Sequence, residues 1–289
     1  MSLSRRHALQ TLLSATASVA LPAWAQADEE GEQYDKIKAS GSLKIAVYKD
    51  NAPFSSEVQG ELVGLDIDIA RALAKEMGLS ASFLPFSAGE NMDADLRWMV
   101  ERGHYLGFGP ADLMMRVPVD RHLMFANRKV FIFGAYMSEK PVLLRDSRRL
   151  DAVRQPDDLL GQPIAAEAGT GLTSVLMGHG GGMLRSQVKL YPDAIAAAQA
   201  VVRGEAAAAY ITRAHAEVAL QRADAPVAHL RMDDLAFGHQ ASRGWPVGVA
   251  IKASNRHLRL AMEEAMGRLQ SSGRLVAIFQ ANKLTLTPP

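Results

Sequence analysis

The sequence predicts an α/β fold in which mostly parallel sheets are covered by helices, and the first observation behind this lies between residues 41 and 86. An apolar run at 43–48 is followed by a turn-rich loop at 50–60 and by a helix that begins after Gly64. The helix has an apolar stripe at three- and four-residue spacing, formed by Ile67, Ala70, Leu73, Ala74 and Met77. A second apolar run follows Gly78. Strand, helix and strand in this order predict a βαβ unit and therefore a parallel pair of strands.

The second observation is that strands and helices keep alternating along the rest of the chain. Apolar runs typical of strands lie at 130–136, 163–166, 206–211 and 247–251. Helices are expected at 93–102, 194–202 and 258–275. The glycine-rich segment 103–110 between two of these elements should be a loop. The alternation extends the α/β prediction to the whole chain.

The first 27 residues have the pattern of a secretory signal peptide. Two arginines, Arg5 and Arg6, precede an apolar stretch, and small residues at 23–25 fit a cleavage site. The apolar stretch is shorter than the roughly 20 residues that a membrane span needs. Because the arginine pair is also similar to a twin-arginine signal, both export routes stay open. We expect a soluble periplasmic protein without a membrane span, beginning near Gln26 or Asp28.

Composition argues against several classes of function. The chain has 32 basic and 31 acidic residues, and removal of a leader with two arginines and no acid leaves a net charge of −1 with histidine neutral. A nucleic-acid-binding protein would usually show a basic stripe. Cysteine is absent, so an exported chain of this kind must be stabilised by burial rather than by disulfides. The histidines lack metal-ligand spacing, and we expect neither a metal nor another cofactor.

Segment 41–86 also resembles the opening of periplasmic solute-binding proteins of the family 3 type. The resemblance rests on the loop at 51–55, AsnAlaProPheSer, and on the phrase at 64–70, GlyLeuAspIleAspIleAla. Further along, 161–171 is similar to the opening of the family's second lobe and 247–279 to the return to its first lobe.

The resemblance implies a type II binding-protein fold with two lobes, each a mostly parallel sheet flanked by helices, and two hinge crossings. We expect lobe 1 to comprise residues 34–134 and 246–284, and lobe 2 to comprise 135–245. The crossings are expected near Ala135 and Trp245. The ligand would bind between the lobes, a common place for small-molecule sites.

Three candidate ligand-binding residues lie in the first strand-to-helix loop, namely Asp50, Asn51 and Phe54. The loop follows the carboxyl end of a strand, where open α/β sheets bind their ligands. In the family, the aromatic residue equivalent to Phe54 lines the cleft. Phe54 could also close the loop against its own helix, so this alternative stays open.

Arg116 and Arg121 are the candidates for an arginine that holds an anionic group of the ligand. Amino-acid binders of the family have a Thr-x-x-Arg phrase here, whose guanidinium holds a carboxylate through two parallel hydrogen bonds. Arg121 fits this phrase with Pro118 in place of the threonine, and Asp112 then stands where the family has a strand aspartate. A shifted loop would bring Arg116 to the cleft instead.

The second lobe supplies the other candidates. Thr170, Gly171 and Thr173 begin a helix whose free backbone N–H groups suit an anion, although Thr170 would serve equally as an N-cap without a ligand. Amino-acid binders of the family have an aspartate for the ligand's ammonium group where this chain has Thr212. Threonine cannot pair with an ammonium in a closed cleft, so common amino acids are expected to be poor ligands.

These features predict a binding protein rather than an enzyme. It would capture a small anionic or polar ligand in the cleft for a membrane transporter of the ABC class. The segment 102–112 also resembles a branch associated with periplasmic quinoprotein (PQQ) dehydrogenases, so a partnership with such a dehydrogenase and its cytochrome is the alternative. A periplasmic dehydratase-like enzyme is a third reading, and its general acid would be Glu167 or His104.

Overall fold

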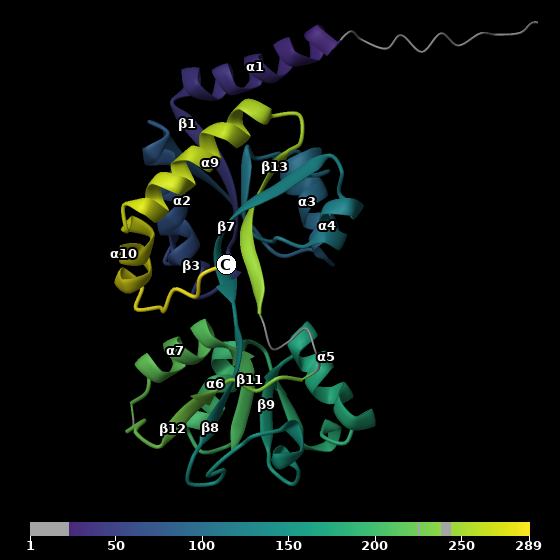
Figure 1. Ribbon diagram of the computed structural model, residues 1–289, viewed down its shortest axis with the longest axis vertical. Helices are drawn as coiled ribbons and strands as arrows, with labels where there is room; N and C mark the ends of the chain where they lie inside the picture. The colour runs from purple at the N-terminus through teal and green to yellow at the C-terminus, as the bar shows by residue number, and fades with distance from the viewer. Residues whose placement is uncertain (1–22, 225, 238–243) are drawn as a thin grey trace, which may run out of the picture.

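The computed structural model describes residues 23–224, 226–237 and 244–289, and it shows two α/β lobes joined by two crossings of the chain (Figure 1). Each lobe has a five-stranded sheet, and a small three-stranded sheet lies beside the first. The predicted fold class is thereby confirmed. Within the described ranges, no helix combines the length and the apolar character that crossing a membrane requires.

The sheet of lobe 1 has the strand order β5-β1-β6-β13-β7. Its strands are β5 (Ser80–Phe86), β1 (Ser42–Tyr48), β6 (Leu113–Pro118), β13 (Trp245–Lys252) and β7 (Val130–Glu139). β1 pairs in parallel with β5 and β6, whereas β13 is antiparallel to both of its neighbours. The predicted βαβ unit is present as β1, α2 (Leu65–Glu76) and β5.

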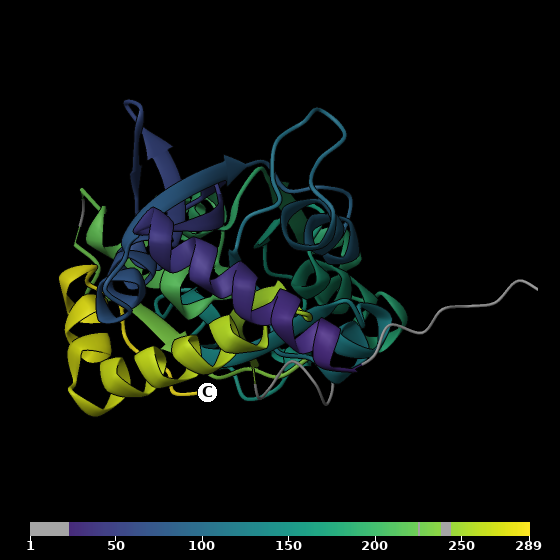
Figure 2. The same ribbon diagram turned by 90° about the horizontal axis from the view of Figure 1, so that it is seen from above.

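Helices cover both faces of this sheet (Figure 1). One face packs against α2, α9 (Arg256–Ser271) and α10 (Arg274–Ala281), and the other against α3 (Met92–Leu96), the π-helical turn Arg97–Glu101 and α4 (Arg121–Ala126). The first helix, α1 (Ala23–Ser40), lies across α9, as Figure 2 shows, and buries Ile37. The single helix expected at 258–275 is two helices, because Gly273 interrupts it with a φ of 75°.

The loop between β1 and α2 folds into a small antiparallel sheet that fixes Phe54. Its strands are β2 (Asp50–Asn51), β3 (Ser55–Val58) and β4 (Glu61–Val63). The backbone N–H of Asp66 donates to the carbonyl oxygen of Phe54 at 2.8 Å. A Cβ at Gly64 would lie 2.5 Å from the same oxygen, and the φ of 125° at this residue also requires glycine. The start of α2 is therefore tied closely to the loop.

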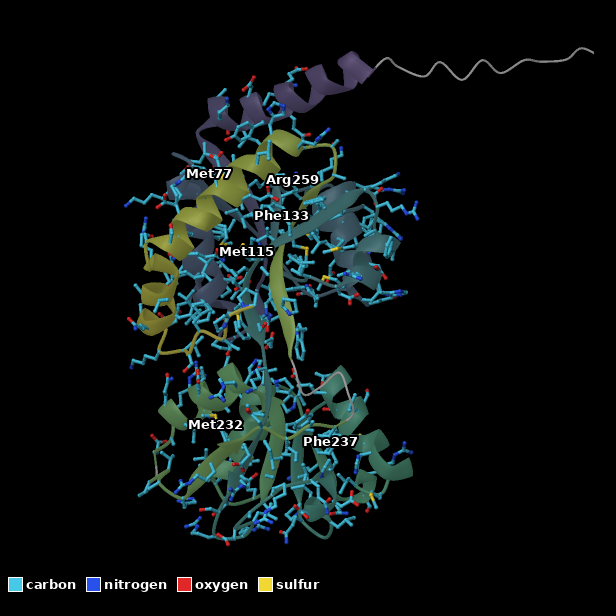
Figure 3. All side chains as sticks on the ribbon, in the orientation of Figure 1. Met77, Met115, Phe133, Met232, Phe237 and Arg259 are labelled. Carbon is cyan, nitrogen blue, oxygen red and sulfur yellow. The ribbon has the colours of Figure 1, made fainter. Side chains whose placement is uncertain are left out.

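Lobe 2 has the strand order β10-β9-β11-β8-β12. Its strands are β10 (Val188–Tyr191), β9 (Ile164–Glu167), β11 (Ala208–Thr212), β8 (Pro141–Asp146) and β12 (Leu230–Asp233). One face is covered by α6 (Ala194–Val202) and α7 (Arg213–Gln221), and the other by α5 (Gly171–Gly178) and the 3₁₀ turns Pro156–Leu159, His179–Gly181 and Arg185–Gln187. Figure 3 shows the separate cores, with Met115 and Phe133 in lobe 1 and Met232 and Phe237 in lobe 2.

The two crossings lie side by side in antiparallel orientation. The chain leaves lobe 1 at the end of β7 and enters β8 after one residue, Lys140. It returns in β13, whose first residue Trp245 pairs with Glu139. Because the chain crosses once in each direction, the two crossing strands have opposite directions, and this introduces antiparallel pairs into sheets that are otherwise parallel.

The ladder around β13 is irregular at Gly248 on both sides. On the β6 side, Val117 pairs with Gly248 and Met115 with Val249, so that Arg116 is an extra, unpaired residue. On the β7 side, residues 134–136 face Gly248 alone. A Cβ at Gly248 would collide with the carbonyl oxygen of Phe133. Such β-bulges turn a side chain out of the regular alternation, and here the side chain concerned is that of Arg116.

Candidate functional site

A cavity of about 490 Å³ lies between the two lobes and is lined by residues of both. Lobe 1 and the crossings contribute Asn51, Arg116, Glu139 and Trp245. Lobe 2 contributes Glu167, Thr170, Gly171, Leu172, Val175, Ala194, Tyr210, Ile211, Thr212 and His215. A second hollow of about 330 Å³ shares Asn51, Glu167, Ala194 and His215 with it and is lined in addition by Asp50, Asp193 and Arg222. The volume fits a small molecule.

Arg116 has a constrained position at the floor of this cavity. Its backbone adopts a φ of 62°, which is unusual for a residue with a side chain and which follows from the bulge in β6. The guanidinium lies over the ring of Phe54, with its central carbon 3.1 Å from the ring centroid. This stacking combines cation–π attraction with burial. Phe54 itself is fully buried, so its ring is a fixed surface against which the guanidinium packs.

Two carboxylates surround the same guanidinium. Its Nη2 donates a hydrogen bond to Oε2 of Glu139, and its Nη1 lies 3.7 Å from Oδ2 of Asp66. The hydroxyl of Tyr136 donates to the other oxygen of Asp66 at 2.7 Å. All these groups are buried, with exposed side-chain fractions of 9% for Arg116, 8% for Glu139 and 1% for Asp66. Arg116 therefore has two carboxylate neighbours within the protein, one of them hydrogen-bonded to it.

The pKa values of this cluster reflect competition between burial and charge. Burial raises the pKa of Asp66, and the positive charge of Arg116 only partly opposes this. Burial alone would lower the pKa of Arg116, but Glu139 and Asp66 together raise it, so the guanidinium stays charged. Within the described residues, Arg116 Nη1 and Asp66 Oδ2 are buried without a hydrogen-bond partner.

The lobe-2 side of the cavity is formed where β9 turns into α5. The hydroxyl of Thr170 accepts from the backbone N–H of Thr173 at 3.2 Å, which makes it the N-cap of α5. The hydroxyl of Thr173 donates to the carbonyl oxygen of Glu167 at 2.6 Å and is buried. Burial, with help from Asp193 and Glu139, raises the pKa of the Glu167 carboxyl group. This carboxyl group lines both hollows.

His215 joins the lobes at the edge of the cavity. It lies on α7 in lobe 2, and its ring meets that of Phe54 in lobe 1 edge-on, with centroids 5.5 Å apart. Its Nδ1 lies 2.7 Å from the hydroxyl oxygen of Thr212, at the end of β11. Burial lowers the pKa of His215, so the ring is neutral at pH 7. Thr212, where the resemblance predicts an aspartate in amino-acid binders, thus contacts His215.

The structure brings together five of the ten candidate residues at the main cavity: Asn51, Arg116, Thr170, Gly171 and Thr212. Asp50 lines the adjoining hollow, while Phe54 and Thr173 lie directly beneath lining residues. Asp112 lies elsewhere, because its carboxylate accepts from the backbone N–H of Lys44 at 2.9 Å and connects β6 to β1. Arg121 is the exposed first residue of α4 and does not line the described cavity.

Several lining residues were not among the sequence-based candidates, notably Glu139, Tyr210, His215 and Trp245. Glu139 and Trp245 lie at the crossings, where sequence patterns are least precise. Tyr210 belongs to an apolar run and has the pattern of an ordinary core residue. A sequence signal was available for His215 only, because it follows Thr212 by three residues, the spacing of neighbours on a helical turn.

Comparison with known proteins agrees with this geometry. The model of the bacterial extracellular solute-binding proteins, family 3, matches residues 43–97. A cyclohexadienyl dehydratase from Pseudomonas aeruginosa is 35% identical over 88 residues. That match covers 30% of this chain and 31% of the dehydratase, so it concerns about a third of either protein.

Solved structures extend the similarity over most of the chain. An ancestral cationic amino acid solute-binding protein, AncCDT-1, superposes with a TM-score of 0.68 at 22% identity, covering 86% of this chain and 98% of that one. An amino acid ABC transporter substrate-binding protein from Streptococcus pneumoniae, bound to L-arginine, gives a TM-score of 0.60 at 20% identity, covering 88% and 98%. At such identities the similarity shows the fold.

The class that fold and cavity define is the two-lobe periplasmic-binding-protein fold of type II. More particularly, the resemblance to the family 3 solute-binding proteins is confirmed by the match of their family model to residues 43–97.

Proposed function

We propose that this protein captures a small polar molecule between its two lobes and closes over it. The observation that carries the proposal is the cavity of about 490 Å³, to which both lobes contribute side chains. A ligand there would touch both lobes only when they approach each other, so its binding would favour the closed arrangement. A hinge motion would be absorbed at Lys140, the single residue between β7 and β8, and at Gly244, directly before β13.

The same proposal places the protein in the periplasm and gives it a transporter of the ABC class as its partner. Support comes from the leader-like first 27 residues and from the relatives, among them the Streptococcus pneumoniae protein. The leader itself falls largely outside the described residues. The alternative partner, a quinoprotein dehydrogenase, would bind at the 103–110 loop, where the side chains of Tyr105 and Leu106 are exposed. Tyr105→Ser with Leu106→Ser should weaken such a contact and leave ligand binding intact.

A thermal-shift screen tests the proposal, with a blocked cavity as its control. The panel would contain amines, polyols, organic acids, amino acids and dipeptides. A ligand present at about a hundred times its dissociation constant stabilises the folded state by about 2.7 kcal/mol. Gly171 lines the cavity and a Cβ there would meet nothing within 4 Å, so Gly171→Phe should fill the space without strain.

The matched control is Gly178→Phe, at the other end of α5, where a Cβ also meets nothing within 4 Å. We expect a hit to stabilise the wild type and Gly178→Phe but not Gly171→Phe. A hit that stabilises all three proteins equally would place its binding elsewhere and refute the proposed site.

A dehydratase-like activity is a second candidate, favoured by Glu167. The pKa of this carboxyl group is raised by burial, the group lines the cavity, and a relative that matches about a third of the chain is a cyclohexadienyl dehydratase. A protonated carboxyl group could donate its proton to the hydroxyl group, which leaves as water when its C–O bond breaks. A hydroxycyclohexadiene would then become aromatic by giving a proton from a neighbouring ring carbon to the carboxylate. Appearance of aromatic ultraviolet absorption with the wild type but not with Glu167→Gln would establish this activity. Equal absorption changes with both proteins would refute it.

A further inference from the structure

The charges around the cavity differ from those of a site built for an anion. Three of its described lining residues carry ionisable carboxylate or guanidinium groups, namely Arg116, Glu139 and Glu167. His215 is neutral at pH 7, because burial lowers its pKa. Arg116 and Glu139 neutralise each other, and Glu167 adds negative charge when it is ionised. The adjoining hollow adds the carboxylates of Asp50 and Asp193 against one arginine, Arg222.

Glu139 holds the position that an anionic ligand group would need. Its carboxylate accepts the hydrogen bond from Nη2 of Arg116, while the guanidinium is held in place by the ring of Phe54. Both side chains are more than nine-tenths buried. The other terminal nitrogen, Nη1, lies 3.7 Å from Oδ2 of Asp66. A carboxylate from the cavity could therefore form two parallel hydrogen bonds with the guanidinium only by displacing Glu139, which is fixed as the last residue of β7 and by its pairing with Trp245. Displacement would leave the buried carboxylate of Glu139 without its counter-ion.

We infer that Glu139 is a specificity-determining residue: it is a built-in counter-ion that occupies Arg116 and makes the cavity reject small carboxylates. This deepens the proposed function and rests on it, since it assumes that the interlobe cavity is the ligand site. The accepted ligands are then neutral or positively charged. Removing the charge of Glu139 should turn Arg116 into an anion site, because the arginine keeps its support from Phe54 and gains a free fork of donors.

The experiment measures the binding of acetate and succinate by calorimetry to the wild type and to Glu139→Gln. We expect no measurable heat of binding with the wild type. The variant should bind these carboxylates about tenfold to a hundredfold more tightly, which is the gain expected from a charge-assisted hydrogen bond. The double variant Glu139→Gln with Arg116→Met should lose this gain. Asp193→Asn, which removes one negative charge from the adjoining hollow without touching Arg116, should not show it.

Because Glu139 is buried, the variant's folding is followed by circular dichroism in the same buffers. If Glu139→Gln is unfolded alone, refolding on addition of acetate supports the inference, and failure to refold overturns it. Carboxylate binding by the wild type as tight as by the variant would also overturn it, as would an equal gain in Asp193→Asn.

The two proposals can fail independently. A wild type that binds succinate in the cavity would support capture of a small molecule and overturn the role of Glu139. If Glu139→Gln gains acetate binding but no compound of the thermal-shift panel binds the wild type, the role of Glu139 is supported and the capture of a small molecule is refuted.

Discussion

Arg116 is constrained both by its backbone conformation and by its buried side-chain contacts. Its backbone has a positive φ, which costs free energy. Its buried charge is stabilised by the carboxylates of Glu139 and Asp66 and by the ring of Phe54. Breaking a buried ion pair by removing one partner typically costs about 3–5 kcal/mol, since the remaining charge is left buried alone. The pair should therefore matter for stability as well as for specificity.

Arg116→Ala is accordingly expected to lower the free energy of unfolding by about 3–5 kcal/mol, measured by urea denaturation. Arg121→Ala, an exposed substitution on α4, should change it by less than about 0.5 kcal/mol. The double variant Arg116→Met with Glu139→Met should be more stable than Arg116→Ala, because it leaves one buried carboxyl group, that of Asp66, without the guanidinium instead of two. Equal, small effects of the two alanine substitutions would show that the buried pair does not stabilise the fold.

Glu167 should make the free energy of unfolding depend on pH. Its pKa is raised in the folded state by burial and then by Asp193 and Glu139. The folded state then binds the proton more tightly than the unfolded state, so this group's contribution to stability falls as pH rises above about 4.5, its unperturbed value. Glu167→Gln should make the decline of unfolding free energy above that pH shallower than in the wild type. A steeper decline in the variant would contradict the assigned direction.

Thr212 and the compensated Arg116 together predict weak binding of common L-amino acids. The carboxylate of an amino acid would find no uncompensated cation among the described lining residues, and the hydroxyl of Thr212 already contacts His215. Titration calorimetry with arginine, glutamine and glutamate should give millimolar affinities or none. Micromolar binding of any of these three amino acids would contradict this prediction.

At the scale of elements, the irregular ladder at Gly248 decides where the site residues point. Arg116 is the extra residue on one side of β13, and on the other side three residues, 134–136, face Gly248 alone. A regular ladder would turn Arg116 to the opposite face of the sheet, because side chains alternate with a period of two. Glycine at 248 is what allows the two neighbouring strands to approach so closely.

Gly248→Ala should therefore destabilise the protein by about 1–3 kcal/mol, because its Cβ would collide with backbone and nothing flexible can give way. Gly267→Ala is the matched control, since Gly267 lies within α9 and a Cβ there would meet nothing within 4 Å. That substitution should stabilise by about 0.5–1 kcal/mol through helix propensity. Urea denaturation of both variants gives the comparison, and a neutral Gly248→Ala would mean that the ladder can relax.

Elements were predictable from sequence wherever their signal is local. The apolar run and stripe at 43–77 gave β1 and α2, because burial periodicity needs no knowledge of distant partners. The break at Gly273 was missed because an apolar stripe continues through it to Leu275, although a glycine after two serines is a usual helix end. The bulge could not be predicted, because it depends on the pairing of three strands that are distant in sequence.

The candidate site shows the same division between local and distant information. Thr170, Gly171 and Thr212 lie at strand-to-helix turns, whose place at the carboxyl edge of a sheet follows from local pattern. The pairing of Arg116 with Glu139 joins residues 23 positions apart through a bulge, so neither its geometry nor its neutral charge was visible in the sequence. Choosing between Arg116 and Arg121 needs the strand register, which only the three-dimensional structure supplies.

If the two lobes close on a small polar molecule, the distance between them must change when that molecule binds. The chain has no cysteine, so two introduced ones can carry dyes without background. Val58 on β3 in lobe 1 and Leu190 on β10 in lobe 2 are suitable places, since 52% and 49% of these side chains are exposed. Energy transfer between dyes at these positions reports the distance between the lobes.

The direct test is this interlobe energy transfer across the ligand panel, in the labelled wild type and in the labelled Gly171→Phe protein. We predict that at least one neutral or positively charged compound changes the transfer efficiency of the wild type saturably and leaves that of the blocked protein unchanged. A panel without effect on the wild type, or an equal change in the blocked protein, would contradict closure on a ligand in this cavity.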